Sequence, residues 1–164
     1  MATITAQVST PRGASMRGRK PFMHETTLDF AAATASKGTA LASAEIFQVM
    51  TIPANHAILD AGIQVTTIHA GTSTDLAIDL GVTGIDADAF VDAFDMDAKA
   101  VGVYAVGAGN GAVAPQAAAD TLDILFQAMT GSTTAGAVRV YAVLMDMSEL
   151  GSVGAEEVDR DTLA

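Results

Sequence analysis

The chain has 164 residues, no cysteine and a formal net charge of −11. Half of its residues are hydrophobic but only 5% are aromatic, so we expect one domain with a core of small and β-branched side chains, as in packed sheets. The lack of cysteine excludes disulfides and thiolate metal sites. Residues 100–119 carry no charge, but their five glycine and proline residues and their lack of Leu and Ile exclude a membrane span, so we expect a soluble protein without membrane contact.

Charge is distributed unevenly along the chain. Residues 1–20 carry +4 with no acidic residue, whereas residues 21–164 carry 4 basic and 19 acidic groups, a net of −15. We therefore predict electrostatic contacts between this basic segment and an acidic protein surface, including that of a neighbouring copy. Nucleic acid is disfavoured as a partner, because the acidic body repels phosphates and the segment lacks interleaved aromatic residues. The predicted contact residues are Arg12, Arg17, Arg19 and Lys20.

Charge and strand periodicity divide the chain into three parts. We predict a basic N-terminal arm over residues 1–25, a β-sandwich domain over residues 26–147 and an acidic C-terminal tail over residues 148–164. In the body, the first predicted strand has Leu28, Phe30 and Ala32 on one face, and an Ala/Ser/Gly-rich linker follows it. Further strands are predicted over residues 46–52, 58–69 and 76–80.

One short helix is predicted next, where Asp88 could cap a turn that places Phe90 and Phe94 four residues apart. Strands over residues 100–106, 122–127 and 138–147 follow, and the last two are expected to form a hairpin. Six or seven strands with this spacing predict an all-β fold: an antiparallel β-sandwich or jelly roll with one short helix and an extended N-terminal arm.

The last predicted strand is apolar on both faces. Tyr141, Val143 and Met145 alternate with Val140, Ala142 and Leu144. Such a strand lies either between two layers or under another subunit. We therefore treat Tyr141, Val143 and Met145 as candidates for subunit packing, with ordinary core as the alternative.

Sequence motifs for catalysis, phosphate binding or metal binding are weak in this chain. The glycines at positions 107, 109 and 111 fit a hairpin loop better than a phosphate loop, since no helix start follows them. The carboxylates between Asp86 and Asp97 could hold Ca²⁺, but the glycine and the final glutamate of an EF-hand are missing, which favours a solvated loop. His24, His56 and His69 are not at metal-ligand spacing, and no Gly-x-Ser-x-Gly motif occurs. We predict no enzyme activity, no cofactor and no metal.

Several strand and turn segments resemble those of capsid decoration, or cement, proteins of tailed bacteriophages. The segments are residues 45–54 (EIFQVMTIPA), 57–67 (AILDAGIQVTT), 75–82 (DLAIDLGV), 86–93 (DADAFVDA) and 120–126 (DTLDILF). The resemblance implies a non-enzymatic protein, often a homotrimer, that binds the outer surface of the virion capsid and clamps major capsid protein subunits together.

On this reading, the arm from Thr10 to Phe22 docks onto the capsid lattice or onto a neighbouring copy. One alternative is a phage head-fibre, vertex or tail protein with a glycan-binding β-sandwich, although the shortage of aromatic residues counts against sugar binding. A second alternative is a lectin-like or metal-binding sandwich outside any virus.

Overall fold

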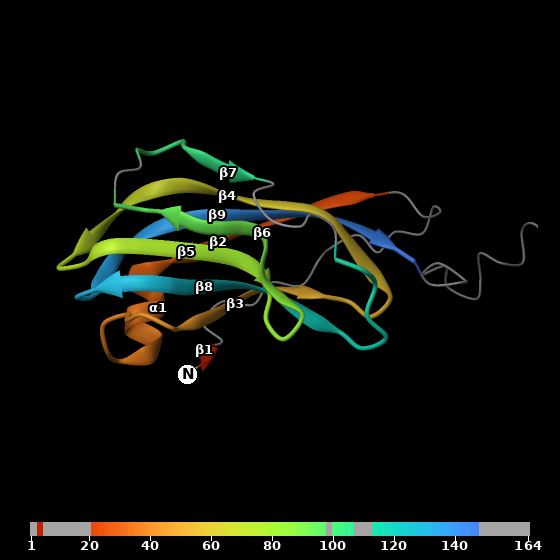
Figure 1. Cartoon of the computed structure of the whole chain (residues 1–164), viewed down its shortest axis with the longest axis horizontal. Coiled ribbons are helices and arrows are strands. Elements are labelled where there is room, and N and C mark those ends of the chain that lie inside the picture. Colours follow the sequence, from red (N-terminus) through yellow and green to blue (C-terminus); the bar gives the residue numbers. More distant parts are fainter. Residues whose placement is uncertain (1–2, 5–20, 98–99, 107–112, 148–164) are drawn as a thin grey trace, which may run out of the picture.

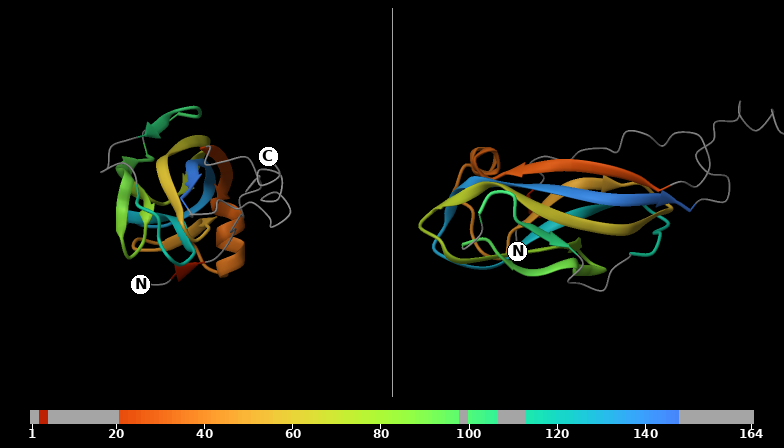
Figure 2. Two further views of the ribbon diagram at one scale, coloured as in Figure 1. Left: turned by 90° about the vertical axis from the view of Figure 1, so that its right-hand side faces the viewer. Right: turned by 90° about the horizontal axis from the view of Figure 1, so that it is seen from above.

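The computed structural model describes residues 3–4, 21–97, 100–106 and 113–147, and these residues form a β-sandwich (Figure 1). The first sheet has the strand order β1-β3-β8-β5-β6 and the second has the order β2-β9-β4-β7. The end-on view in Figure 2 shows the strands enclosing a single interior, which confirms the predicted fold class. The elements are β1 (Thr3–Ile4), β2 (Phe22–Asp29), α1 (Phe30–Lys37), β3 (Ile46–Ile52), β4 (His56–Gly71), β5 (Thr74–Val82), β6 (Asp86–Asp95), β7 (Tyr104–Val106), β8 (Asp120–Thr130) and β9 (Thr133–Asp146).

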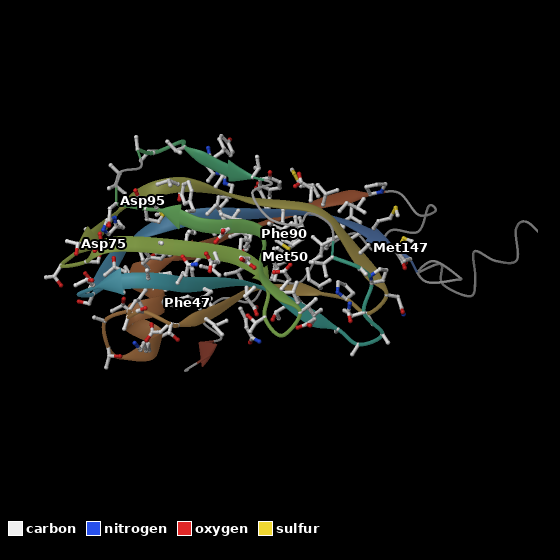
Figure 3. All side chains as sticks on the ribbon, viewed as in Figure 1. Phe47, Met50, Asp75, Phe90, Asp95 and Met147 are labelled. Carbon is white, nitrogen blue, oxygen red and sulfur yellow. The ribbon has the colours of Figure 1, made fainter. Side chains whose placement is uncertain are left out.

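The core forms because one row of each long strand is apolar and faces the opposite sheet. Leu76, Ile78 and Leu80 of β5 are completely buried, as the predicted alternation requires. Phe126 of β8 packs against Phe30 and Phe47 with ring centroids 5.3 and 4.8 Å away. Phe47, Met50 and Phe90, which are labelled in Figure 3, are also completely buried.

The prediction of a helix at Asp88 is wrong, because this segment is strand β6. Its ladder with β5 is irregular: Leu80 pairs with Val91, yet Ile78 pairs with Phe94. The Oδ1 atom of Asp79 accepts a hydrogen bond from the backbone N–H of Ala93 at 2.7 Å and so satisfies a donor in the irregular stretch. A bulged strand brings Phe90 and Phe94 to the core side with the same spacing that one helical turn would give.

The helix lies instead at Phe30–Lys37, where the sequence pattern predicted a strand. Asp29 ends β2 and caps the helix, with its Oδ1 accepting hydrogen bonds from the N–H groups of Ala31 and Ala32. Gly38 follows in the left-handed conformation with φ of 79°, which is a common way to end a helix. The capping residue and the alanine-rich run therefore outweigh the local alternation.

The predicted hairpin between the last two long strands is also wrong. β8 pairs with β3 and β5, whereas β9 pairs with β2 and β4 in the other sheet. The chain crosses between the sheets at Gly131 and Ser132, so the buried rows of β8 and β9 face each other across the core. Alternation gives each strand a buried row but does not say whether the two rows share a sheet or oppose each other.

The strand predicted over residues 100–106 is shorter in the structure and covers Tyr104–Val106. The glycine-rich turn predicted after it lies outside the described residues, as does the acidic tail. β2 begins at Phe22, so the described part of the second sheet includes residues 22–25. Within the described ranges, no helix has the length and apolarity that crossing a membrane would take.

Candidate assembly surface

The last strand, β9, lies between β2 and β4 in the second sheet and is apolar on both sides, as predicted. Val140, Ala142 and Leu144 are completely buried in the core. Tyr141, Val143 and Met145 alternate with them and lie half-buried on the outer face of the sheet. The three predicted contact residues therefore come together on one surface, and they do not lie between the two sheets.

The strand register shows what surrounds them. Each residue pair in a ladder points to the same face, so the outward residues of β9 extend into rows across the sheet. One row contains Met23, Val143 and Asp60; the next contains Glu25, Tyr141, Gly62 and Val106; the third contains Thr27, Arg139, Gln64 and Tyr104.

Large apolar side chains on these rows are exposed to solvent. Met23 is 66% exposed, Tyr104 is 60% exposed and Val106 is 52% exposed. Exposed large apolar side chains that gather on one face of a sheet are typical of a contact with another protein. We call it the outer apolar surface, and it comprises Met23, Leu59, Tyr104, Val106, Tyr141, Val143, Met145 and Met147. Met147, labelled in Figure 3, lies at the end where β9 leaves the sandwich.

Tyr141 is held in place by a glycine on the neighbouring strand. A Cβ atom at Gly62 would lie 2.7 Å from the phenol oxygen of Tyr141 and 2.7 Å from Cγ1 of Val106. The missing side chain thus lets the phenol group lie across β4. Burial, and secondarily the nearby Asp60 carboxylate, raise the pKa of Tyr141 above its usual 10. The hydroxyl is therefore protonated at neutral pH and can donate a hydrogen bond at this surface.

The three rows also contain three charged residues, Glu25, Asp60 and Arg139. Arg139 and Glu25 approach to 4.0 Å, but both side chains are about half exposed, so the pair contributes little to stability. A subunit that covers this face must leave Glu25, Asp60 and Arg139 in contact with water or pair them, because burying an unpaired charge is costly.

The outer side of the first sheet is different, because it contains buried carboxyl groups. Asp79 and Asp123 are 3% and 4% exposed. Burial raises the pKa of both, and the carboxylates of Asp92 and Asp88 raise that of Asp79 further. Across the described stretches, no group of three or more His, Asp or Glu residues is arranged to hold a metal ion.

His56 and His69 lie in separate environments. Nδ1 of His56 lies 3.0 Å from the carbonyl oxygen of Ala54, and the His56 ring packs edge-on against Phe22. His69 contacts Asp97 at 3.0 Å, and Asp97 also accepts a hydrogen bond from the backbone of Leu76. The contacts of Asp97 with His69 and Leu76 join β4, β5 and the segment after β6, so they stabilise that end of the sandwich.

The structure does not describe the other predicted contact residues. Arg12, Arg17, Arg19 and Lys20 lie outside the described residues, so their contacts stay predictions. Conversely, sequence reasoning missed Met23, Tyr104 and Val106. Their places on the outer apolar surface depend on which strands flank β9, and that is decided by pairing between residues far apart in the chain.

The chain matches no protein-family model and no curated protein sequence. Similar solved structures come from phage capsids. A chain in the capsid of Ralstonia phage GP4 has a TM-score of 0.58 at 15% identity, covering 90% of this chain and 100% of that one. A chain in the capsid asymmetric unit of Cyanophage Pam1 has a TM-score of 0.54 at 14% identity, covering 82% and 91%.

This fold occurs in phage capsids. Because the likeness extends over nearly the whole of both matched chains, it includes both sheets of the sandwich. At such low identity the likeness concerns the fold, and residue roles have to come from this chain's own surface.

Proposed function

We propose that this protein is a structural component of a phage virion that binds the outside of the head and stabilises the lattice of major capsid proteins. The observation that carries the proposal is the outer apolar surface, which is displayed on a sandwich whose fold occurs in two phage capsids. The proposed role requires no catalytic step. It requires burial of apolar area and complementary charge.

The outer apolar surface packs against a neighbouring copy in a closed homotrimer. Tyr141, Val143 and Met145 lie near its centre, and Met23 and Val106 extend it onto the flanking strands. Closed assembly covers the same surface on every copy and leaves none of it exposed to further association. Three copies joined in this way bind the lattice at several points, so contacts that are weak individually add up.

The basic segment supplies electrostatic contacts. Residues 21–164 carry a net charge of −15, so an acidic protein surface attracts the four basic residues of the segment and repels the rest of the chain. Contacts of this type weaken when salt screens them. Binding that depends on Arg12, Arg17, Arg19 and Lys20 is therefore expected to fall as ionic strength rises.

The test is reconstitution on undecorated, expanded capsids assembled from the accompanying major capsid protein. Full-length protein and a version lacking residues 1–22 are added, and occupancy is measured by co-sedimentation at low and high salt. We expect saturable binding of the full-length protein and weaker binding of the truncated version. Failure of the full-length protein to bind would refute the proposal, and equal binding of both versions would refute the role of the basic segment.

Binding to a glycan array without capsid binding would favour a head-fibre, vertex or tail protein.

A further inference from the structure

The N-terminal residues of the chain add a strand to the first sheet. Thr3 and Ile4 form β1, which pairs in parallel with Ile46 and Phe47 at the edge of β3. The next described strand, β2, begins at Phe22 at the edge of the second sheet. β1 is therefore attached to its own domain by this two-residue ladder and by residues 5–21.

Within the part of the chain that the structure describes, the edge of β3 has room for strand addition. Among the described residues, β1 covers β3 at Ile46 and Phe47, and the ladder does not extend along Val49–Ile52. The other edge of the same sheet is protected, since β6 has an irregular ladder and carries exposed carboxylates. Main-chain addition is thus favoured at β3.

The chain between the two strands is long enough to reach another subunit. At about 3.3 Å per extended residue, residues 5–21 span up to roughly 55 Å. That distance is similar to the length of the 16-residue strand β4, which is the longest in the molecule. Thus β1 can reach the β3 edge of its own domain or that of an adjacent copy.

We propose that β1 of one copy pairs with β3 of a second copy in the assembled state. This inference deepens the proposed assembly role and rests on it, since assembly is what brings the copies close. The ladder of Thr3 with Ile46 and Ile4 with Phe47 is the same in either arrangement, so exchange costs little. A high local concentration of neighbours then favours the exchanged form.

Charge complementarity is compatible with this exchange. The connecting segment carries Arg12, Arg17, Arg19 and Lys20, whereas residues 21–164 carry a net charge of −15. A neighbouring acidic copy therefore attracts the segment that links β1 to β2.

The absence of cysteine from the natural chain allows a direct test. Full-length chains carrying Thr3→Cys and full-length chains carrying Ile46→Cys are refolded together, oxidised and analysed on a non-reducing gel. We expect a disulfide-linked pair of one chain of each kind. Substituting Thr72→Cys, at an exposed position after β4 that does not pair with β1, for Ile46→Cys serves as the matched control and is expected to give no such pair.

A disulfide that forms within the double Thr3→Cys, Ile46→Cys chain but not between the mixed single variants would overturn the exchange, as would no cross-link in either preparation. Ile46 is buried, so the experiment is repeated at exposed Ala44 with Ala44→Cys and a short bis-maleimide linker, which leaves the core intact. Capsid occupancy is measured separately. Normal occupancy without exchange would refute this inference alone, and exchange without occupancy would refute the proposed function.

Discussion

Asp123 is a carboxyl group buried on the outer side of β8. Its Oδ2 atom accepts a hydrogen bond from the backbone N–H of Thr83, while its Oδ1 atom is buried without a partner among the described residues. Burial raises the pKa of Asp123 above the ordinary 3.8, although hydrogen bonds from Thr121 and Thr83 oppose the shift. The folded state therefore binds this proton more tightly than the unfolded state does.

This difference in proton binding determines how the contribution of Asp123 to stability changes with pH. Because the folded pKa of Asp123 is raised, its contribution to stability is greatest below the unfolded value and declines as pH rises through the folded value. We expect Asp123→Asn to raise the free energy of unfolding at pH 7 by about 1 kcal/mol and to have a smaller effect near pH 3.5. Urea denaturation at the two pH values, with Glu25→Gln as the exposed control, measures it. A variant that is less stable at pH 7 than the natural protein would contradict the account.

Substitution of Gly62 is expected to destabilise the fold. Gly62→Ala places a Cβ atom 2.7 Å from the Tyr141 phenol oxygen and 2.8 Å from the backbone oxygen of Ala105, so both β9 and β7 have to shift. We expect a loss of about 1–3 kcal/mol in unfolding free energy, as is common for overpacked sites. Chemical denaturation monitored by circular dichroism measures it. An unchanged midpoint would show that Tyr141 does not lie across this glycine.

At the scale of elements, α1 depends on its N-terminal cap. Asp29→Ala removes the acceptor of the N–H groups of Ala31 and Ala32, which lie 2.8 and 3.1 Å from its Oδ1. We expect a loss of about 1 kcal/mol in unfolding free energy. Thr27→Ala, an exposed position on the same strand, is the control and is expected to have a smaller effect. Equal effects of the two substitutions would mean that the cap does not stabilise the helix.

The sequence predicted the strands that have one clear buried row. β5 and β8 lie where alternation placed them, because burial of alternate apolar residues is a local signal. β3 also lies where it was predicted, although its bulge buries residues on both sides of Gln48. α1 was missed because Leu28, Phe30 and Ala32 also fit a strand, and the capping function of Asp29 was not recognised. The hairpin error at Gly131 arose because local alternation contains no information on which sheet a strand joins.

The candidate surface was predictable only where its residues give a local signal. Tyr141, Val143 and Met145 stand out because their strand is apolar on both faces, and that is visible locally. Met23 and Val106 join them through ladders that link residues far apart in the chain. A pattern within one strand cannot provide such long-range pairing.

For the whole molecule, the outer apolar surface is expected to hold subunits together. Val143→Asp places a carboxylate at its centre, and burying an unpaired charge costs several kcal/mol, so association should weaken by at least about 100-fold. Sedimentation velocity measures the change. Ile85→Asp is the matched control, since Ile85 is also exposed, at 48%, but belongs to the turn after β5. Equal sedimentation of the two folded variants would exclude this surface as the subunit contact.

The opposite faces of the sandwich thus differ in chemistry. The outer side of the first sheet carries carboxyl groups, including buried Asp79 and Asp123, whereas the second sheet displays the outer apolar surface. In the proposed assembly, apolar burial joins the copies through the second sheet and the basic segment connects their acidic bodies. Both contacts are repeated on every subunit, and repetition strengthens attachment to a lattice.

Thermal opening of capsids tests the central claim, stabilisation of a phage head, most directly. Undecorated expanded capsids are heated alone, with the natural protein or with folded Val143→Asp protein, and the opening temperature is followed by light scattering. The account predicts a higher opening temperature with the natural protein than with none, and a smaller increase with the variant. An opening temperature that does not change when the capsids are fully occupied by the natural protein would contradict it.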